Sequence, residues 1–221
     1  MSAVRSAWSQ TEAIRVLDLW KRRLKLPDYR HYRRGSELFV SGTSHDAAYL
    51  IVQGIVALYY PLTSGQETLF LLAYPGELVN SSALDTSYPE TPSPTGSAVT
   101  NCIVYRIDAR LMEAAERDDS EIVKMFNRAL QKSINKRTQK LIELKTLPPA
   151  ERLRRNLCEL AQVLGFDVTG KPVRVWLPLK DAELAMLLGL SERQFKRVKK
   201  SFQEDGKVRV DNSRAFVLPE C

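Results

Sequence analysis

The feature that most constrains the fold is a change of hydrophobic period near residue 110. Between residues 32 and 107, short apolar runs alternate with turn signals such as Ser41-Gly42, Gln53-Gly54 and Pro75-Gly76. Residues 111–146 then contain neither proline nor glycine, and their apolar residues recur at close to heptad spacing. Short runs bounded by turns are typical of β-strands, and an uninterrupted heptad-like run is typical of a long helix. The chain is therefore predicted to be α+β, with a β segment before the long helix.

The first segment predicts a small β-barrel or jelly roll, because its short strands recur at nearly regular spacing. The predicted strands are Glu37–Val40, Ala48–Val52, Ile55–Tyr60, Thr68–Leu72 and Val99–Ile107. A loop rich in serine, threonine and proline is expected at 86–94. An amphipathic helix is expected at 8–25, with Ala13, Ile14, Leu17 and Leu24 on its apolar stripe.

A helix over 111–146 would carry a single apolar seam that it cannot bury alone. The seam consists of Ile122, Phe126, Ala129, Leu130, Ile134, Leu141 and Leu144. We expect it to pack on its own barrel and on a second copy of the chain, as a coiled-coil seam does. Packing on the barrel without dimerisation is the alternative.

The C-terminal part predicts a smaller unit after the Pro148-Pro149 hinge. We expect an amphipathic helix ended by Gly165, a strand over 173–177, two short helices, and a β-hairpin or wing at 208–218. The predicted domains are therefore a barrel domain with its N-terminal helix (1–110), a long dimerisation helix (111–147) and a winged helix-turn-helix domain (148–221).

The segment 181–198 fits a helix-turn-helix. Ala185 is small where two helices would cross, and Gly189 permits the positive φ of a tight turn. Ser191 is a good N-cap for the second helix. Phe195, Val198 and Phe202 would form its inner stripe, which turns Arg193, Arg197 and Lys200 outward.

The outward face of this second helix is predicted to enter the major groove of DNA. Residues 193–200 hold five basic side chains and no acidic one. Arginine can pair with guanine through two hydrogen bonds, whereas lysine is suited to phosphates. The predicted DNA contacts are Lys180, Ser191, Glu192, Arg193, Gln194, Lys196, Arg197, Lys199 and Lys200. The alternative is a merely solvated basic face.

The charge distribution agrees with an anionic partner for the ends of the chain. The net charge of +7 is uneven, since residues 35–110 carry two basic against seven acidic side chains and residues 147–221 carry fourteen against ten. No apolar run is long enough to cross a bilayer, and no secretory signal begins the chain, so a cytoplasmic protein without a membrane partner is expected.

The order of barrel, long helix and helix-turn-helix resembles the bacterial CRP/FNR family of transcription regulators over about residues 12–218. Residues 48–58 are similar to the family's "YxIxxGxVxL" and residues 75–79 to its "xPGDxxG". Residues 183–198 resemble its "EIAxxxGxSxExVxRxL". The resemblance implies a homodimer that reads a palindromic site, with base contacts from Glu192, Arg193 and Arg197 and with RNA polymerase as a further partner. The family often has Arg before Glu where this chain has Glu192 before Arg193, and Thr where it has Lys180.

The effector side departs further from the family. Where cyclic-nucleotide binders carry a ribose-binding glutamate and a phosphate-binding arginine, this chain has Asn80-Ser81-Ser82 and Ser93. Arg137 and Thr138 fall at the family's polar positions on the long helix. These six residues are the candidate effector site, and a ligand other than a cyclic nucleotide is expected. The alternative is a barrel that serves only as a scaffold.

Enzymatic and cofactor functions find little support in the residues. The chain has only His31 and His45 and no HxH pair, so it lacks the metal ligands of a cupin-like enzyme. A barrel that senses a small molecule, with DNA binding as a secondary function, is the alternative hypothesis. Residues 1–30 contain no cysteine for an iron–sulfur cluster. We therefore predict no catalytic residues, no metal site and no cofactor other than an unknown small-molecule effector. A non-specific nucleic-acid binder is the third reading, but its stacking aromatics are absent from the basic helix.

Overall fold

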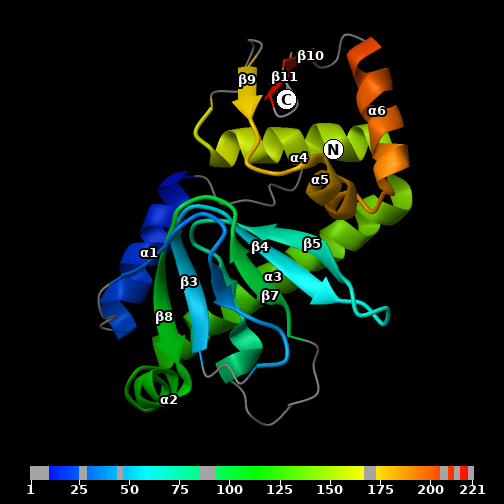
Figure 1. Ribbon diagram of the computed structural model, residues 1–221. Coiled ribbons are helices and arrows are strands. Elements are labelled where there is room, and N and C mark those ends of the chain that lie inside the picture. The colour runs from blue at the N-terminus through cyan, green and yellow to red at the C-terminus, as the bar shows by residue number, and fades with distance from the viewer. Residues whose placement is uncertain are drawn as a thin grey trace. The chain divides into compact units, whose positions relative to one another are not determined.

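Residue contacts divide the chain into two units, one from Trp8 to Arg137 and the other from Thr138 to Cys221. The computed structural model describes residues 10–24, 29–43, 47–84, 93–166, 173–204, 209–211 and 215–218 (Figure 1). The predicted loop at 86–94 lies mostly outside the described residues. Among the described helices, none combines the length and apolar character needed to cross a membrane.

Two antiparallel four-stranded sheets form the centre of the first unit, in the orders β1-β8-β3-β6 and β2-β7-β4-β5. The strands are β1 (Arg30–Tyr32), β2 (Glu37–Phe39), β3 (Ala47–Gln53), β4 (Val56–Pro61), β5 (Glu67–Ala73), β6 (Leu78–Val79), β7 (Thr95–Ala98) and β8 (Cys102–Asp108). All five predicted strands are present, and β1, β6 and β7 were not predicted. Over the described residues no strand of one sheet pairs with the other, so the predicted barrel is not closed.

Apolar side chains from both sheets make the core of this unit, including Phe39, Tyr49 and Val104. The sharp turn at Gly54 shows why this core accepts no larger residue there. Gly54 has a φ of +93°, and an added Cβ would lie 2.7 Å from Sγ of Cys102. The Gln53-Gly54 turn therefore requires glycine both for its backbone conformation and for space.

The N-terminal helix α1 (Gln10–Leu24) covers part of the β1-β8-β3-β6 sheet. Trp20 and Leu24 are buried in a second apolar cluster with Leu50 and Ile107. Ile14, which was expected on the buried stripe, is 59% exposed. The buried stripe thus runs through Trp20 and Leu24 rather than through Ile14.

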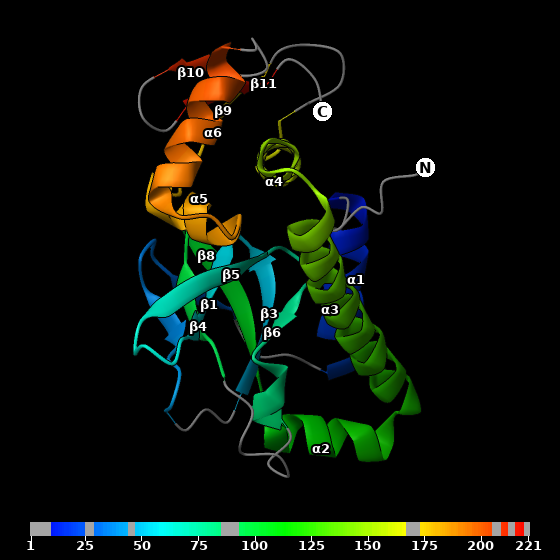
Figure 2. The ribbon, with the colours of Figure 1, turned by 90° about the vertical axis from the view of Figure 1, so that its right-hand side faces the viewer.

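The predicted continuous helix over 111–146 is two helices, α2 (Ala109–Asp118) and α3 (Ser120–Thr146). The chain turns sharply between them (Figure 2). The cause is Asp119, whose Oδ1 accepts a 2.9 Å hydrogen bond from the backbone N–H of Glu121. A side chain that caps the first turn of a new helix ends the preceding one, because the capping residue cannot be helical itself. Nothing in the spacing of the apolar residues indicated this break.

The predicted seam of α3 is also divided between two faces. Ile122 and Met125 are buried against the first unit's second apolar cluster, and Phe126 and Ala129 pack on it. In contrast, Val123, Ile134, Leu141 and Ile142 are between 37% and 55% exposed. Only part of the predicted seam is therefore covered by the chain itself.

The second unit combines three helices with a small sheet of order β10-β11-β9. Its elements are α4 (Pro149–Val163), β9 (Val173–Trp176), α5 (Asp181–Leu187), α6 (Glu192–Glu204), β10 (Arg209–Asp211) and β11 (Ala215–Leu218). Gly165 follows α4 with a φ of +85°, as the sequence predicted for the end of this helix. β10 and β11 pair antiparallel, in agreement with the predicted hairpin, whose turn at 212–214 lies outside the described residues.

Candidate nucleic-acid interface and pocket

A tight turn at Gly189 joins α5 to α6. Gly189 has a φ of +64°, and its N–H donates to the carbonyl of Met186, while the N–H of Leu190 donates to the carbonyl of Ala185. An added Cβ at Gly189 would lie 2.8 Å from Cδ2 of Leu144. The predicted positive φ is confirmed, and the close approach of Leu144 adds a second reason for glycine.

Ser191 begins α6 with a reciprocal cap. Its Oγ accepts a 3.2 Å hydrogen bond from the N–H of Gln194, and Oε1 of Gln194 accepts a 2.9 Å bond from the N–H of Ser191. Two backbone donors that a helix start leaves without partners are satisfied in this way. Ser191 and Gln194, both predicted DNA contacts, therefore also fix where α6 begins.

The two faces of α6 differ completely in character. Phe195 and Phe202 are buried, and the side chains of Glu192, Arg193, Gln194, Lys196, Arg197 and Lys200 are exposed. Lys200 makes one long ion pair, 3.7 Å from Oε1 of Glu204, with both side chains more than 60% exposed. The exposed face thus presents four cations, Arg193, Lys196, Arg197 and Lys200, at the three- and four-residue spacing of one helix face.

Lys199 does not share this face. Its Nζ lies 2.9 Å from both carboxylate oxygens of Asp181, and its side chain is 13% exposed. The ion pair joins α6 to the first residue of α5. We therefore assign Lys199 to the packing of the two helices rather than to the predicted DNA contacts.

Lys180 immediately precedes α5 and is exposed. Its backbone N–H donates a 2.6 Å hydrogen bond to Oε2 of Glu183, which anchors the first turn of the helix. The side chain thus stands beside the start of α5, where the sequence placed it.

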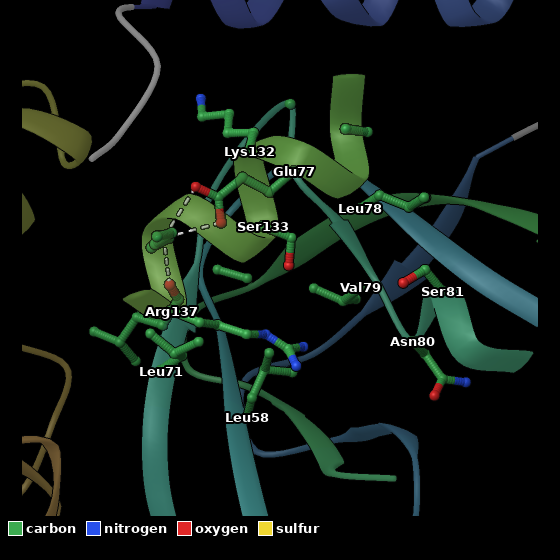
Figure 3. A pocket seen from close by; sticks show the side chains of 15 residues that line it. Leu58, Leu71, Glu77, Leu78, Val79, Asn80, Ser81, Lys132, Ser133 and Arg137 are labelled. Atoms are coloured by element: carbon green, nitrogen blue, oxygen red, sulfur yellow. Dashed lines mark hydrogen bonds and ion pairs between the residues drawn. The ribbon is translucent and has the colours of Figure 1, made fainter. Parts of the chain in front are cut away.

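A pocket in the first unit lies between α3 and the strands β4, β5 and β6 (Figure 3). Its empty space amounts to about 550 Å³, a figure that includes open solvent at its mouth. Its walls combine apolar and polar side chains, and the polar ones come from the turn after β5, the start of the short 3₁₀ helix Ser81–Leu84, and α3. The apolar lining residues are Leu58, Leu71, Leu72, Ala73, Leu78, Val79 and Ala129.

Three of the six candidate effector residues line this pocket, namely Asn80, Ser81 and Arg137. Asn80 is buried at a φ of +57°, and its Nδ2 donates to the carbonyl of Ala47 at 2.9 Å. Ser82 and Ser93 are not among the lining residues, and Thr138 begins the other unit. The structure therefore brings together only half of the predicted set.

Glu77 and Lys136 are two pocket residues that were not among the candidate effector residues. Nζ of Lys136 lies 2.9 Å from both carboxylate oxygens of Glu77 and donates to the carbonyl of Leu72 at 2.7 Å. Glu77 belongs to the Pro75-Gly76-Glu77 turn already noted in the sequence. Lys136 is adjacent to Arg137, but neighbours on a helix differ by about 100° in direction, and nothing in the pattern showed that Lys136 points inward.

Arg137 is a lining cation of the pocket that forms no ion pair with the described residues. Its guanidinium lies beside Leu58 in the close-up and 5.9 Å from the ring of Tyr60 (Figure 3). Glu77, the one carboxylate among the lining residues, is already paired with Lys136. The pocket can therefore offer a planar cation next to an apolar wall, which suits an acidic group attached to an apolar body.

Comparisons with known proteins agree with this arrangement. A profile of the cyclic nucleotide-binding domain matches residues 29–119. The chain is 24% identical over 186 residues to the CRP-like cAMP-activated global transcriptional regulator of Mycobacterium tuberculosis, covering 84% of this chain and 82% of that protein.

Two solved structures share the fold over nearly the whole chain. The c-di-GMP-responsive global regulator CLP of Xanthomonas campestris matches with a TM-score of 0.73 at 20% identity, covering 96% of this chain and 100% of that one. TTHA1359, a CRP/FNR-family transcriptional regulator of Thermus thermophilus, matches with a TM-score of 0.70 at 18% identity, covering 87% of this chain and 94% of that one.

The fold is thus that of a regulator with a cyclic-nucleotide-binding type of β unit followed by a helix-turn-helix unit. Over most of its length the chain is similar to transcription regulators of the CRP/FNR type, and its residues 29–119 match the cyclic nucleotide-binding domain. The resemblance expected from the sequence is confirmed.

Proposed function

We propose that this transcription regulator binds DNA as a homodimer and reads a palindromic site with α6 in successive major grooves. The observation that carries the proposal is the division of α6 into a buried aromatic face and an exposed cationic face beyond a reciprocal Ser191–Gln194 cap. A helix fixed at its start and cationic on its outer side fits the major groove. The hairpin of β10 and β11 would be the wing of a winged helix.

Within α6 we assign different roles to the arginines and the lysines. Arg193 and Arg197, one helical turn apart, would read base edges, because a guanidinium can donate two parallel hydrogen bonds to guanine. Glu192 and Gln194 stand beside them and would complete or orient the base contacts. Lys196, Lys200 and Lys180 would contact phosphates, which position the protein and make its binding depend on salt.

Dimerisation would use the exposed apolar side chains of α3. Val123, Leu130, Ile134 and Leu141 recur at seven- and four-residue intervals, as the apolar positions of a heptad do. Val123, Ile134 and Leu141 are at least 37% exposed. A second α3 would cover this stripe and place two copies of α6 on one duplex. RNA polymerase would be a further contact of the bound dimer.

The pocket beside Arg137 would receive a small-molecule effector with an acidic group. Asn80, Ser81 and Ser133 supply polar contacts around it. Such a ligand would change the relative populations of the orientations that can and cannot bind DNA.

The roles of the arginines and the lysines are tested with two variants, Arg197→Ala and Lys200→Ala. Binding is measured on a duplex that the wild-type chain selects from random sequences and on a scrambled duplex of equal composition. We expect Arg197→Ala to lose preference mainly at one base step in each half-site, by about 1–3 kcal/mol. Lys200→Ala should weaken binding to both duplexes by the same factor.

Lys124→Ala is the control, because Lys124 is also an exposed lysine in an ion pair but lies on α3. It should leave both affinities unchanged. Equal losses on the selected and scrambled duplexes for Arg197→Ala would refute the assignment of α6 as the base-reading helix.

A further inference from the structure

A largely buried ion pair links α3 to the β-sheet unit beside the pocket. It consists of Lys136 on α3 and Glu77 in the turn between β5 and β6, with side chains only 11% and 12% exposed. In Figure 3 dashed lines mark the bonds made by the carboxylate of Glu77. We call Glu77, Lys136 and the carbonyl of Leu72 the clasp.

The clasp uses the full bonding capacity of the lysine. An ammonium group has three N–H donors, and Nζ of Lys136 has three acceptors within 2.9 Å, the two oxygens of Glu77 and the carbonyl of Leu72. The face of the Tyr74 ring lies 4.0 Å from the same nitrogen. A buried cation with every donor satisfied and an aromatic ring beside it is held in one geometry.

The sheet side of the clasp is equally fixed. The N–H of Gly76 donates to the carbonyl of Ile51, and the N–H of Ile51 donates to the carbonyl of Glu77. Gly76 has a φ of +84°, which the turn requires. The carboxylate that receives Lys136 therefore projects from a turn bonded to the central strand β3, not from a mobile loop.

The clasp makes the same connection that a bound small molecule would make. A ligand in the pocket would touch α3 on one side and β5, the β5–β6 turn and β6 on the other, since these elements line it. Lys136 already connects α3 to a carbonyl of β5 and to the carboxylate of that turn. The chain thus supplies from its own residues the bridge that would otherwise depend on an effector.

We propose that the clasp holds α3 on the β-sheet unit without a ligand, so that the effector-free protein is competent to bind DNA. Lys136 and Glu77 are positioning residues in this account, because they act on α6 only through α3. The inference rests on the proposed DNA-binding function.

The test compares four full-length proteins from which small molecules have been removed by unfolding and refolding. They are the wild type, Lys136→Met, the double variant Glu77→Gln with Lys136→Met, and Lys124→Met. Native mass spectrometry checks that no ligand remains. Lys124 is the control, because it forms an exposed ion pair with Glu121 on the same helix. Affinity for the selected duplex, its dependence on salt, and the melting temperature are measured for each.

The double variant separates positioning from stability. Lys136→Met removes the cation that faces the largely buried Glu77 carboxylate and can unfold the unit, whereas the double variant removes both charges of the pair. We expect the double variant to melt within a few degrees of the wild type and yet to bind DNA at least about tenfold more weakly. Its salt slope should be unchanged, because the phosphate contacts of α6 are intact. Lys124→Met should stay within about twofold of the wild type.

Two results would overturn the inference while leaving the proposed function in place. One is a double variant that binds the duplex as tightly as the wild type. The other is wild-type protein that selects its duplex as purified but loses this ability once freed of small molecules. A wild type that binds no DNA in either preparation would refute the proposed function itself, and the inference with it.

Discussion

Lys199 and Asp181 form an ion pair that joins the middle of α6 to the first turn of α5, with Nζ 2.9 Å from each carboxylate oxygen. The pair lies at the edge of the helix-turn-helix core, next to the ring of Phe195. It distinguishes Lys199 from Lys196 and Lys200, whose side chains are exposed. A lysine engaged in holding two helices together is not available to neutralise a DNA phosphate.

Lys199→Met should therefore lower stability by about 1 kcal/mol, as expected for a partly exposed ion pair, and leave the salt slope of DNA binding unchanged. Lys196→Met should do the reverse, reducing the salt slope by about 1 without a loss of stability. The measurements are urea unfolding and DNA affinity over a series of salt concentrations. A reduced salt slope for Lys199→Met would return this residue to the phosphate contacts.

Ser191→Ala should loosen the start of α6. Loss of an N-cap costs about 1 kcal/mol, and here the N–H of Gln194 loses its acceptor. Hydrogen exchange should become faster in the first turn of α6 and stay unchanged in α4. Ser201→Ala, at an exposed position within the same helix, is the control and should not accelerate exchange. Equal exchange rates in both variants would contradict the capping role.

Gly189→Ala should be among the most damaging single changes in the second unit. Alanine at this position would be held at a positive φ, and its Cβ would lie 2.8 Å from Leu144. We therefore expect the free energy of unfolding to fall by about 2–4 kcal/mol from backbone strain and overpacking together. Gly65→Ala separates the two effects, because Gly65 has a φ of +81° with no atom within 4 Å of the added carbon. It should cost only about 1 kcal/mol. The free energy of unfolding is measured by chemical denaturation. Equal decreases for Gly189→Ala and Gly65→Ala would show that Leu144 moves aside without an energetic cost.

The pH dependence of the unfolding free energy should include a contribution from the carboxyl group of Glu151, in the first turn of α4. Hydrogen bonds from Arg154 hold the pKa of Glu151 below its ordinary value of 4.5, with Arg155 contributing less. A carboxylate with a lowered pKa in the folded state stabilises the protein above pH 4.5, and the contribution is lost as pH falls through the folded pKa. The difference in unfolding free energy between the wild type and Glu151→Gln should therefore shrink below that pH. A difference independent of pH would show that the pairing adds no stability.

The sequence predicted the fold well wherever local chemistry decides the structure. Gly165, Gly189 and Ser191 act at the helix ends predicted for them, because positive φ values and caps depend on single residues. The break at Asp119 was missed, because residues 111–146 contain no proline or glycine and an aspartate there could equally be an exposed residue within one helix. The strands β1, β6 and β7 were missed because two to four residues are too few to show a period.

The candidate site was predictable on α6 and poorly so in the pocket. The cationic face of α6 follows from helical period alone, whereas the ion pair of Lys199 requires knowledge of where α5 lies. Ser82 and Ser93 were included by alignment with the family, but the pocket is lined instead by Glu77 and Lys136, whose pairing across 59 residues no local pattern encodes. Contacts between charged side chains far apart in the sequence are therefore the features of this protein that could not be predicted from local sequence patterns.

The most direct test of the account is the selection of DNA by the purified chain from a pool of random duplexes. We predict enrichment of a palindromic sequence with half-sites about one helical turn apart, bound by two chains per duplex, and loss of that enrichment in the Arg193→Ala, Arg197→Ala double variant. Selection of no sequence, or the same sequence selected by the double variant, would contradict the claim that α6 reads DNA.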